Sequence, residues 1–389
     1  MTDILVTKLI DTIVDRLDIP RSYYQKAAAR HRSLGEWLCR SESRVAVFHP
    51  NVSPQGSFRF GTVILPLHAD GEYDLDNVTT LQLAKMAMTQ RQIKEIYGGE
   101  IKGYAIAHGM VKPDEKNRCW RLHYSDEVSF HLDALPCVPE ESDVIAAITS
   151  RGVPAQLAAL AVAITDKRHP DYERISRALL SSNPRGFATW FEECARPSAL
   201  ARIRGLLERK LYARVEDVPP YEWRTPLQRS IQFLKRHRDV MFRDDPTVDP
   251  ISMVITNLAA HAYSGETDIS SALTNIVEKM PQYVRQTRPR VPNPADPAED
   301  YADKWSRNPI LEQNFWAWHA QARTDVASLS RLLRSPSLAE GVRRIVAVDL
   351  TEEELKQLEA PEVRSTRQVV RAAPALSIPT APRPWSDRD

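Results

Sequence analysis

Apolar side chains repeat every fourth position near the N-terminus, at Leu5, Leu9, Ile13 and Leu17. This spacing lays one apolar stripe along a helix. A second helical pattern follows over about residues 23–38. The pattern therefore predicts two helices ahead of the first strand.

Alternating polar and apolar residues, typical of half-buried strands, occur further along the chain. The stretch VSFHLD alternates in this way, and Val128, Phe130 and Leu132 are expected on the core side. The short apolar run LAVAITDK, residues 160–167, fits a strand or a short core helix equally well. Both interpretations of that run stay open.

The second half of the chain has helical patterns separated by prolines. Thr225 followed by Pro226 predicts an N-cap and a first helical turn, so we expect a helix over PLQRSIQFLKRHRDVMF. The stretch DPISMVITNLAAHAYSG predicts another helix, which ends at Gly265. Residues 288–300, RPRVPNPADPAED, are typical of an extended connector.

These patterns predict an α+β protein in three parts. We expect a mixed core with N-terminal helices over residues 1–200, a helical lobe over 201–335 and a disordered tail over 360–389. The tail is rich in proline and weakly apolar, which does not favour a packed core. The length of 389 residues also favours two folded domains, because one hydrophobic core seldom organises so long a chain.

Charge and cysteine content narrow the class of protein. The chain carries 52 basic and 51 acidic residues, so bulk charge indicates neither a nucleic-acid coat nor a polybasic membrane anchor. Its four cysteines lie far apart without a C-x-x-C pair, which excludes a zinc ribbon and a dense disulfide framework. Charged residues interrupt the first apolar stretch, so it is neither a secretion signal nor a membrane span. We expect a cytoplasmic protein without a membrane partner.

Two aspartates in YDLDN are candidate metal ligands. Residues two apart project from the same face of a strand, so Asp74 and Asp76 stand side by side while Leu75 points into the core. Adjacent anions are unfavourable without a cation, and Mg²⁺ accepts a few carboxylate oxygens while keeping positions for water and phosphate. A calcium loop is excluded, because Leu75 and Leu81 occupy the positions that require glycine and glutamate.

A glycine–serine turn, QGSFRFGT, precedes these aspartates. Gly56 lets the backbone approach a ligand and Ser57 offers an N–H and a hydroxyl, which suits phosphate oxygens; a plain surface turn is the alternative. A third acid occurs in FHLDALP, where Asp133 shares a strand face with His131. A charged residue in register at the end of an apolar strand suggests that Asp133 completes the acidic site.

The G-S turn, the D-x-D pair and the later single aspartate together resemble the nucleotidyltransferase fold of the polymerase-beta superfamily. Four longer stretches resemble more closely the bacterial cGAS/DncV-like nucleotidyltransferases (CD-NTases) of antiphage systems: PQGSFRFGTVILPLHADGEYDLDNV, SSNPRGFATWF, TPLQRSIQFLKRHRD and NPADPAEDYADKW. The resemblance covers most of residues 1–335. It implies a polymerase-beta-type core with a mixed β-sheet and a C-terminal helical lobe. Asn77 departs mildly from the family, which usually has an apolar or catalytic-strand residue after D-x-D.

The resemblance also implies roles for the candidate residues. Asp74, Asp76 and Asp133 are the implied catalytic and metal-binding residues, and they hold two Mg²⁺ ions, for which Mn²⁺ can substitute. The implied nucleotide-binding residues are Gln55, Gly56, Ser57, Lys235 and Ser252. A solvated surface charge is the alternative for Lys235, and a helix N-cap is the alternative for Ser252.

The activity that the resemblance implies is synthesis of a cyclic oligonucleotide second messenger from ATP and GTP, with release of pyrophosphate, in antiphage defence. The family favours a purine cyclic dinucleotide, such as a cGAMP isomer, with a trinucleotide as the other product. A nucleotidyltransferase that modifies RNA or protein is the alternative enzyme. A catalytically silent scaffold is less favoured, because all three acids are present.

Three further expectations concern partners and a misleading motif. The chain lacks a cysteine–histidine zinc cluster, so no DNA activator is expected. The C-terminal tail is a candidate for conjugation by a ubiquitin-transfer-like partner, as in some family members, and a spare disordered tail is the alternative. The HRD sequence at 237–239 looks like a kinase catalytic loop but lacks the later asparagine, so His237 and Arg238 are expected on a solvated helix face.

Overall fold

The computed structural model describes residues 2–68, 71–125, 129–196, 216–219 and 224–359. The chain divides into two units, Met1–Leu350 and Thr351–Asp389. The second unit contributes one described helix, α14 (Glu352–Glu359). The boundary expected near residue 200 and the tail over 360–389 both lie outside the described residues, so the division into domains stays a prediction.

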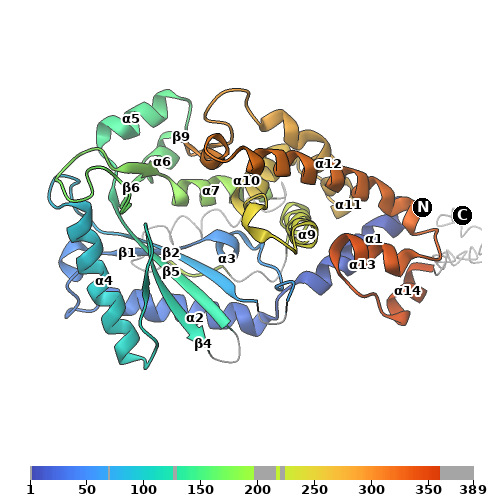
Figure 1. Cartoon of the computed structure of the whole chain (residues 1–389), viewed down its shortest axis with the longest axis horizontal. Coiled ribbons are helices and arrows are strands. Elements are labelled where there is room, and N and C mark those ends of the chain that lie inside the picture. The colour runs from blue at the N-terminus through green and yellow to red at the C-terminus, as the bar shows by residue number, and fades with distance from the viewer. Residues whose placement is uncertain (1, 69–70, 126–128, 197–215, 220–223, 360–389) are drawn as a thin grey trace, which may run out of the picture. The chain divides into compact units, whose positions relative to one another are not determined.

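One mixed sheet forms the centre of the first unit (Figure 1). Its strands are β1 (Asn51–Gln55), β2 (Tyr73–Thr80), β3 (Asp114–Glu115), β4 (Trp120–Ser125), β5 (Ser129–Pro139), β6 (Val162–Ile164) and β7 (Leu180–Ser182). The order is β1-β2-β5-β4-β3, with β6 and β7 joined to the far end of β5. Strands β2 and β5 run parallel, and the remaining pairs of this sheet are antiparallel. The sequence of residues 160–167 fitted either a strand or a short helix, and the structure shows that it contains strand β6.

Helices surround this sheet and build the C-terminal half. They are α1 (Thr2–Leu17), α2 (Arg21–Cys39), α3 (Gly56–Phe60), α4 (Gln90–Ala107), α5 (Ser142–Ser150), α6 (Ala155–Ala158), α7 (Pro184–Ala195), α9 (Pro226–Met241), α10 (Ser252–Ala262), α11 (Ile269–Lys279), α12 (Pro309–Leu332) and α13 (Leu338–Val346). Short 3₁₀ turns cover Ala46–Phe48, Pro246–Val248, Met280–Tyr283 and Asp303–Ser306. The mixed sheet with its helices confirms the predicted α+β fold. Among the described helices, none is long and apolar enough to cross a membrane.

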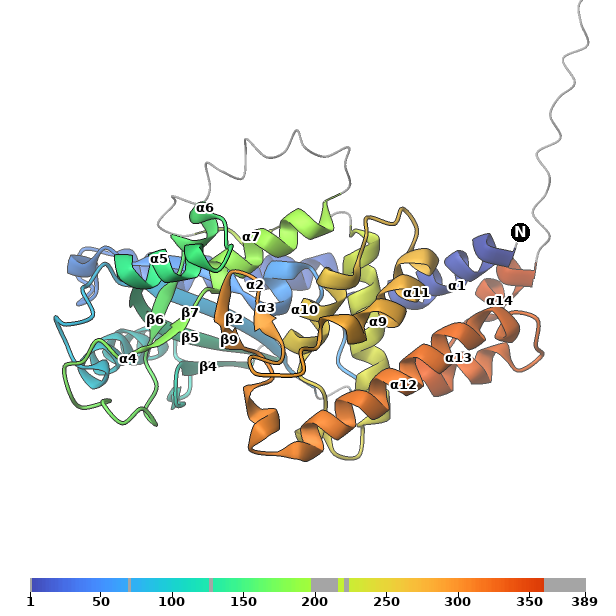
Figure 2. The same cartoon turned by 90° about the horizontal axis from the view of Figure 1, so that it is seen from above.

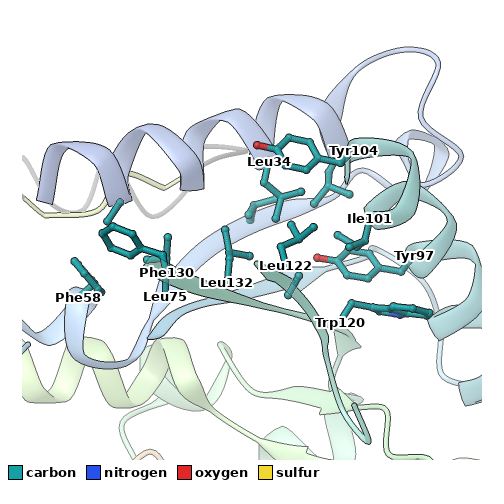
Figure 3. Close-up of a cluster of buried hydrophobic side chains, with 14 of the residues drawn as sticks. Leu34, Phe58, Leu75, Tyr97, Ile101, Tyr104, Trp120, Leu122, Phe130 and Leu132 are labelled. Atoms are coloured by element: carbon teal, nitrogen blue, oxygen red, sulfur yellow. The ribbon is translucent and has the colours of Figure 1, made fainter. Parts of the chain in front are cut away.

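The main hydrophobic core lies between the sheet and helices α2 and α4 (Figure 3). Leu75, Phe130 and Leu132 point from the sheet toward these helices and are fully buried. The residues that alternate with them therefore face the other side of the sheet. The alternation predicted from the sequence thus determines which side chains of the sheet lie outside this core and can form a functional site.

Helix α9 begins as predicted and is packed on several sides. The Thr225 hydroxyl accepts a hydrogen bond from the Gln228 backbone, while the Gln228 side chain accepts one from the Thr225 backbone, which completes a capping box. The helix contacts α1, α10, α11, α12 and α13. In Figure 2 it lies between the sheet and helices α11 to α13. Helix α1, although first in the sequence, packs against α9 and α11.

One helix end and one loop differ from the sequence prediction. Helix α10 ends at Ala262, three residues before Gly265. The stretch expected as an extended connector contains a small hairpin of β8 (Pro292–Asn293) and β9 (Asp296–Asp300). The hairpin forms because side chains of β7 and the following loop hold it, and such a long-range contact leaves no local pattern.

Candidate active site

The parallel pairing of β2 and β5 brings the three predicted acids to one face of the sheet. Asp76 lies opposite Asp133 in the strand register, and Asp74 lies opposite His131. Because side chains alternate along each strand, Asp74, Asp76 and Asp133 project away from the buried core. The acids come from segments almost sixty residues apart, and one strand pair places them together.

Asp76 is the acid most affected by its surroundings. Burial raises the pKa of Asp76 to about 7, and the nearby carboxylates of Asp74 and Asp133 contribute to the increase. The positive charges of Arg121 and Lys235 oppose it. Ionising Asp76 at neutral pH is therefore unfavourable without more positive charge, and a divalent cation would supply that charge.

Arg121 lies among the acids, and the sequence analysis missed it. It projects from β4 opposite Asp133 in the register. Its Nε is 2.7 Å from one Asp133 oxygen and its Nη2 is 2.8 Å from the other, which makes a bidentate pair. Its Nη2 also lies 3.9 Å from Asp74. The alternation of WRLHYS could have placed Arg121 on the acidic face, had the pairing of β4 with β5 been known.

Arg121 affects whether the three acids are arranged to bind the expected metal ions. Carboxylate oxygens are suitable ligands for Mg²⁺, and because burial raises the pKa of Asp76, added positive charge would favour its ionised form. As the side chains stand, however, no three His, Cys, Asp or Glu residues within the described ranges are arranged to hold a metal ion. Arg121 engages both oxygens of Asp133, and this bidentate pair is a physical reason for that arrangement.

The glycine–serine turn packs directly against the acids. Gln55 ends β1 opposite Asp76, and Gly56 follows with a φ of +67°, in the left-handed region. An added Cβ at Gly56 would lie 2.0 Å from the Asp76 Oδ2, so this position has no room for a side chain. Helix α3 begins at Gly56, and Ser57 is its second residue. Gln55 itself is buried, with its Nε2 3.5 Å from the Ser53 hydroxyl. The turn and the carboxylates therefore form one continuous site.

One face of α9 holds the loop that follows this turn. Gln228 donates to the Phe60 carbonyl and Gln232 donates to the Val63 carbonyl, both at 2.8 Å. Lys235 Nζ donates to the Thr62 carbonyl at 3.1 Å.

The buried position of Lys235 perturbs its ionisation. Lys235 is only 6% exposed, so its interpretation as a solvated surface charge is wrong. Burial lowers the pKa of Lys235 to about 7, and the charge of Arg238 adds to this effect. Asp239 and Asp76 oppose it. The charge of Lys235 lowers the pKa of Asp76, and the charge of Asp76 raises the pKa of Lys235.

Ser252 is placed beside α9 through Arg238. Ser252 is the first residue of α10, and its hydroxyl accepts a hydrogen bond from Arg238 Nη1 at 2.9 Å. The N-cap is Ile251, so the N-cap interpretation of Ser252 is wrong. Arg238 also pairs with Asp249 at 3.1 Å.

The predicted solvated face at HRD is likewise wrong. His237 is 2% exposed, and its Nε2 lies 3.2 Å from Asp325 of α12. Arg238 is also largely enclosed, with 11% of its side chain exposed. Helices α10 to α13 cover this side of α9, and that packing could not be read from the helical period.

Two of the stretches that carry the family resemblance meet in space. Ser181 and Ser182 donate to Asp296 and Glu299, each at 2.8 Å. Asn183 Nδ2 donates to the Ala295 carbonyl at 2.8 Å. These bonds tie the end of β7 to the β8–β9 hairpin, so the two stretches form one buried polar network.

Asn77, the mild departure from the family, has a partner on the opposite side of the sheet from the acids. Its side-chain amide lies 2.7 Å from Nδ1 of buried His31, whose Nε2 lies 2.6 Å from the Glu216 carbonyl. The Asn77 atom that faces Nδ1 is Oδ1, so the two ring nitrogens of His31 join Asn77 to the Glu216 backbone. Asn77 therefore fastens α2 to the back of β2.

Comparisons with known proteins agree with this fold. The family described as "Cyclic GMP-AMP synthase DncV-like, nucleotidyltransferase domain" matches residues 50–137. That segment contains the turn, all three acids and Arg121. It does not reach Lys235 or Ser252, whose roles rest on the resemblance and on the contacts above.

Curated relatives and a solved structure extend the likeness along the chain. A c-di-GMP synthase of Roseivirga ehrenbergii is 26% identical over 316 residues, covering 79% of this chain and 76% of the relative. The cyclic dinucleotide synthase CdnG of Bradyrhizobium diazoefficiens is 24% identical over 326 residues, covering 77% and 70%. The structure of the B. diazoefficiens CD-NTase CdnG in complex with GTP aligns with a TM-score of 0.65 at 16% identity, covering 92% of this chain and 97% of that one. The structural likeness supports the fold, and the curated relatives indicate a nucleotidyltransferase.

Proposed function

Since the chain belongs to the DncV-like nucleotidyltransferases, the CD-NTases, we propose that it joins nucleoside triphosphates into a cyclic dinucleotide second messenger. The observation that carries the proposal is the strand register that sets Asp76 opposite Asp133, with Asp74 on the same face and the Gly56 turn against Asp76. A nucleotidyl transfer needs negative groups to hold cations, and a tight turn beside them to receive phosphates.

The reaction is an in-line substitution performed twice. A ribose hydroxyl oxygen of one nucleotide attacks the α-phosphorus of another, the new P–O bond forms, the bond to pyrophosphate breaks, and the hydroxyl proton is lost. A second transfer between the joined nucleotides closes the ring. When bound, divalent cations, two Mg²⁺ or Mn²⁺ ions in the family, supply charge neutralisation of the phosphates and lower the pKa of the attacking hydroxyl.

The chain's own residues would divide this work. Asp74, Asp76 and Asp133 would hold the cations. The backbone of the Gly56–Ser57 turn, with Gln55 beside it, would orient the β- and γ-phosphates. This role suits Gly56 because the absence of a side chain keeps the turn in contact with the Asp76 carboxylate.

Lys235 is the proposed cation for the triphosphate. In the structure its ammonium group has two neutral partners, the carbonyl and hydroxyl oxygens of Thr62. A buried ammonium that is incompletely neutralised loses affinity for its proton, which accounts for the lowered pKa. A phosphate nearby would restore the charge of Lys235 and would itself be stabilised. Ser252 would support this region through its bond with Arg238.

The relatives favour guanine as a substrate base. One is named a c-di-GMP synthase, and the CdnG structure holds GTP. We therefore propose GTP as a substrate, with ATP as the second purine if the ring is mixed. The bases, the ring size and the linkage are questions for product analysis.

Product analysis tests the proposal directly. The purified protein is incubated with Mg²⁺ and with GTP, ATP or all four triphosphates, then treated with phosphatase, and the products are examined by mass spectrometry. We expect a phosphatase-resistant cyclic product from triphosphates alone, and none from the Asp74→Ala/Asp76→Ala protein. An equal yield from that variant would show that the site is wrongly assigned. Label transferred to added RNA or protein, with no cyclic product, would favour the alternative enzyme.

The biological setting is a separate proposal. A role in antiphage defence follows from the resemblance, and loss of plaque protection in cells that carry the Asp74→Ala/Asp76→Ala protein would support it. Conjugation at the tail concerns residues outside the described ranges and stays a prediction. Deleting residues 370–389 and finding unchanged conjugates in cells would reject it.

A further inference from the structure

The acidic face contains a cation of its own, the guanidinium group of Arg121. This group donates two hydrogen bonds to Asp133, of 2.7 and 2.8 Å, and it approaches Asp74 to 3.9 Å. It therefore lies between two of the three acids proposed to bind cations. Only 27% of the Arg121 side chain and 21% of the Asp133 side chain are exposed, so water screens the pair weakly.

A carboxylate that binds an arginine in this way is poorly prepared to bind a metal ion. Both Asp133 oxygens already accept strong charge-assisted hydrogen bonds. A divalent cation on either oxygen would also lie close to a guanidinium that cannot lose its charge.

We propose that Arg121 is the built-in counter-cation of this site and that it must leave Asp133 before Asp133 can bind a divalent ion. Arg121 thereby sets the metal concentration at which the site is loaded. In the metal-free protein it stabilises Asp133 and Asp74 on one face of the sheet. The inference rests on the proposed function only in taking these acids as the cation site.

Metal binding in the absence of nucleotide tests the inference without reference to synthesis. Free Mn²⁺ is measured by electron paramagnetic resonance during titration of the parent protein, Arg121→Gln and Arg121→Lys, all stripped of metal with a chelator. We expect Arg121→Gln to bind Mn²⁺ at least tenfold more tightly than the parent, because glutamine keeps a hydrogen-bond donor but no charge. Arg121→Lys should lie between the two.

Two controls separate competition at Asp133 from a general change of charge. Arg177 also joins two carboxylates, Glu141 at 2.7 Å and Asp143 at 3.2 Å, but lies outside the site. Arg177→Gln removes the same charge and should bind Mn²⁺ as the parent does. Adding Asp133→Asn to Arg121→Gln should abolish the gain, because the ligand that was released is then removed.

The opposite results would overturn the inference. They are equal or weaker Mn²⁺ binding by Arg121→Gln, a gain that survives Asp133→Asn, or no Mn²⁺ binding by either the parent or Arg121→Gln. If Arg121→Gln does not fold, the parent labelled with ¹⁵N-arginine gives a second measurement. The Nε–H signal of Arg121, identified by its loss in Arg121→Lys, should shift when Mg²⁺ binds, and an unchanged signal at saturating Mg²⁺ would refute the release. Because cyclic product is not measured, failure of the proposed function would appear separately.

Discussion

Replacing Gly56 by alanine tests whether the turn and the carboxylates work as one site. The new Cβ would lie 2.0 Å from the Asp76 Oδ2, whereas real Cβ contacts essentially never fall below 3.0 Å. Either the carboxylate or the turn must therefore move by at least about 1 Å, and misplacement of this size is enough to cost about 100-fold in rate. The backbone adds a cost, because φ is +67° and a left-handed residue other than glycine costs roughly 1–2 kcal/mol.

Gly109 provides the matched control for this change. Its φ is +63°, almost the same as that of Gly56, but an added Cβ there meets nothing within 4 Å. Gly109→Ala should therefore lose a similar 1–2 kcal/mol of stability through its backbone and keep its activity.

The assay combines urea unfolding with initial rates of pyrophosphate release at saturating GTP and Mg²⁺. We expect comparable losses of stability in Gly56→Ala and Gly109→Ala, and a fall of about 100-fold in rate for Gly56→Ala alone. If Gly56→Ala retained the parental rate, the close approach of turn and carboxylate would have no part in catalysis. If both variants lost activity equally, the loss would follow from instability, and the reasoning would also fail.

Three further changes follow from the buried charges. In metal-free protein, Asp76→Asn should stabilise the fold. The fold raises the pKa of Asp76 from 3.8 to about 7, so the parent loses up to about 4 kcal/mol of stability as pH rises from 4 to 7 and the acid ionises. Urea unfolding of the variant and the parent should therefore show the gain in stability at pH 8 and not at pH 4. Lys235→Met should weaken GTP binding at least tenfold in calorimetry with little loss of stability, and unchanged affinity would remove Lys235 from the site. Burial lowers the pKa of His31 below its ordinary 6.5, so the unfolded chain takes up the proton first and the stability of the fold should fall as pH drops below about 6.5. This fall is measured in proteins that carry Asp76→Asn, and it should vanish when His31→Gln is added.

Local patterns were sufficient for much of the fold and for the acids. The alternation around Asp74 and Asp76, and again around Asp133, predicted which side chains share a face, because this property depends only on neighbouring residues. The capping signal at Thr225 likewise placed the start of α9. What these patterns lack is the identity of the partner strand or helix.

Each residue that the sequence analysis missed or misplaced has surroundings that are set by a partner strand or helix. Arg121 belongs to the site because β4 pairs with β5, and no spacing within β4 indicates this. The sequence predicted a solvated helix face at His237, yet other helices bury this residue and Asp325 supplies its polar contact. The Gly56 contact with Asp76 similarly requires the antiparallel pairing of β1 with β2.

The charges of the site are therefore set by tertiary structure, even though its acids are visible in the sequence. Three carboxylates project from the sheet, one cation reaches them from the neighbouring strand, and another approaches from helix α9. Desolvation raises the pKa of half-buried Asp76 to about 7 and lowers the pKa of buried Lys235 to about 7, so the protein alone compensates neither charge well. A triphosphate with its divalent cations would bring both missing charges at once, positive charge for Asp76 and negative charge for Lys235. This complementarity is the physical reason why a site that is unfavourable when free suits that class of substrate.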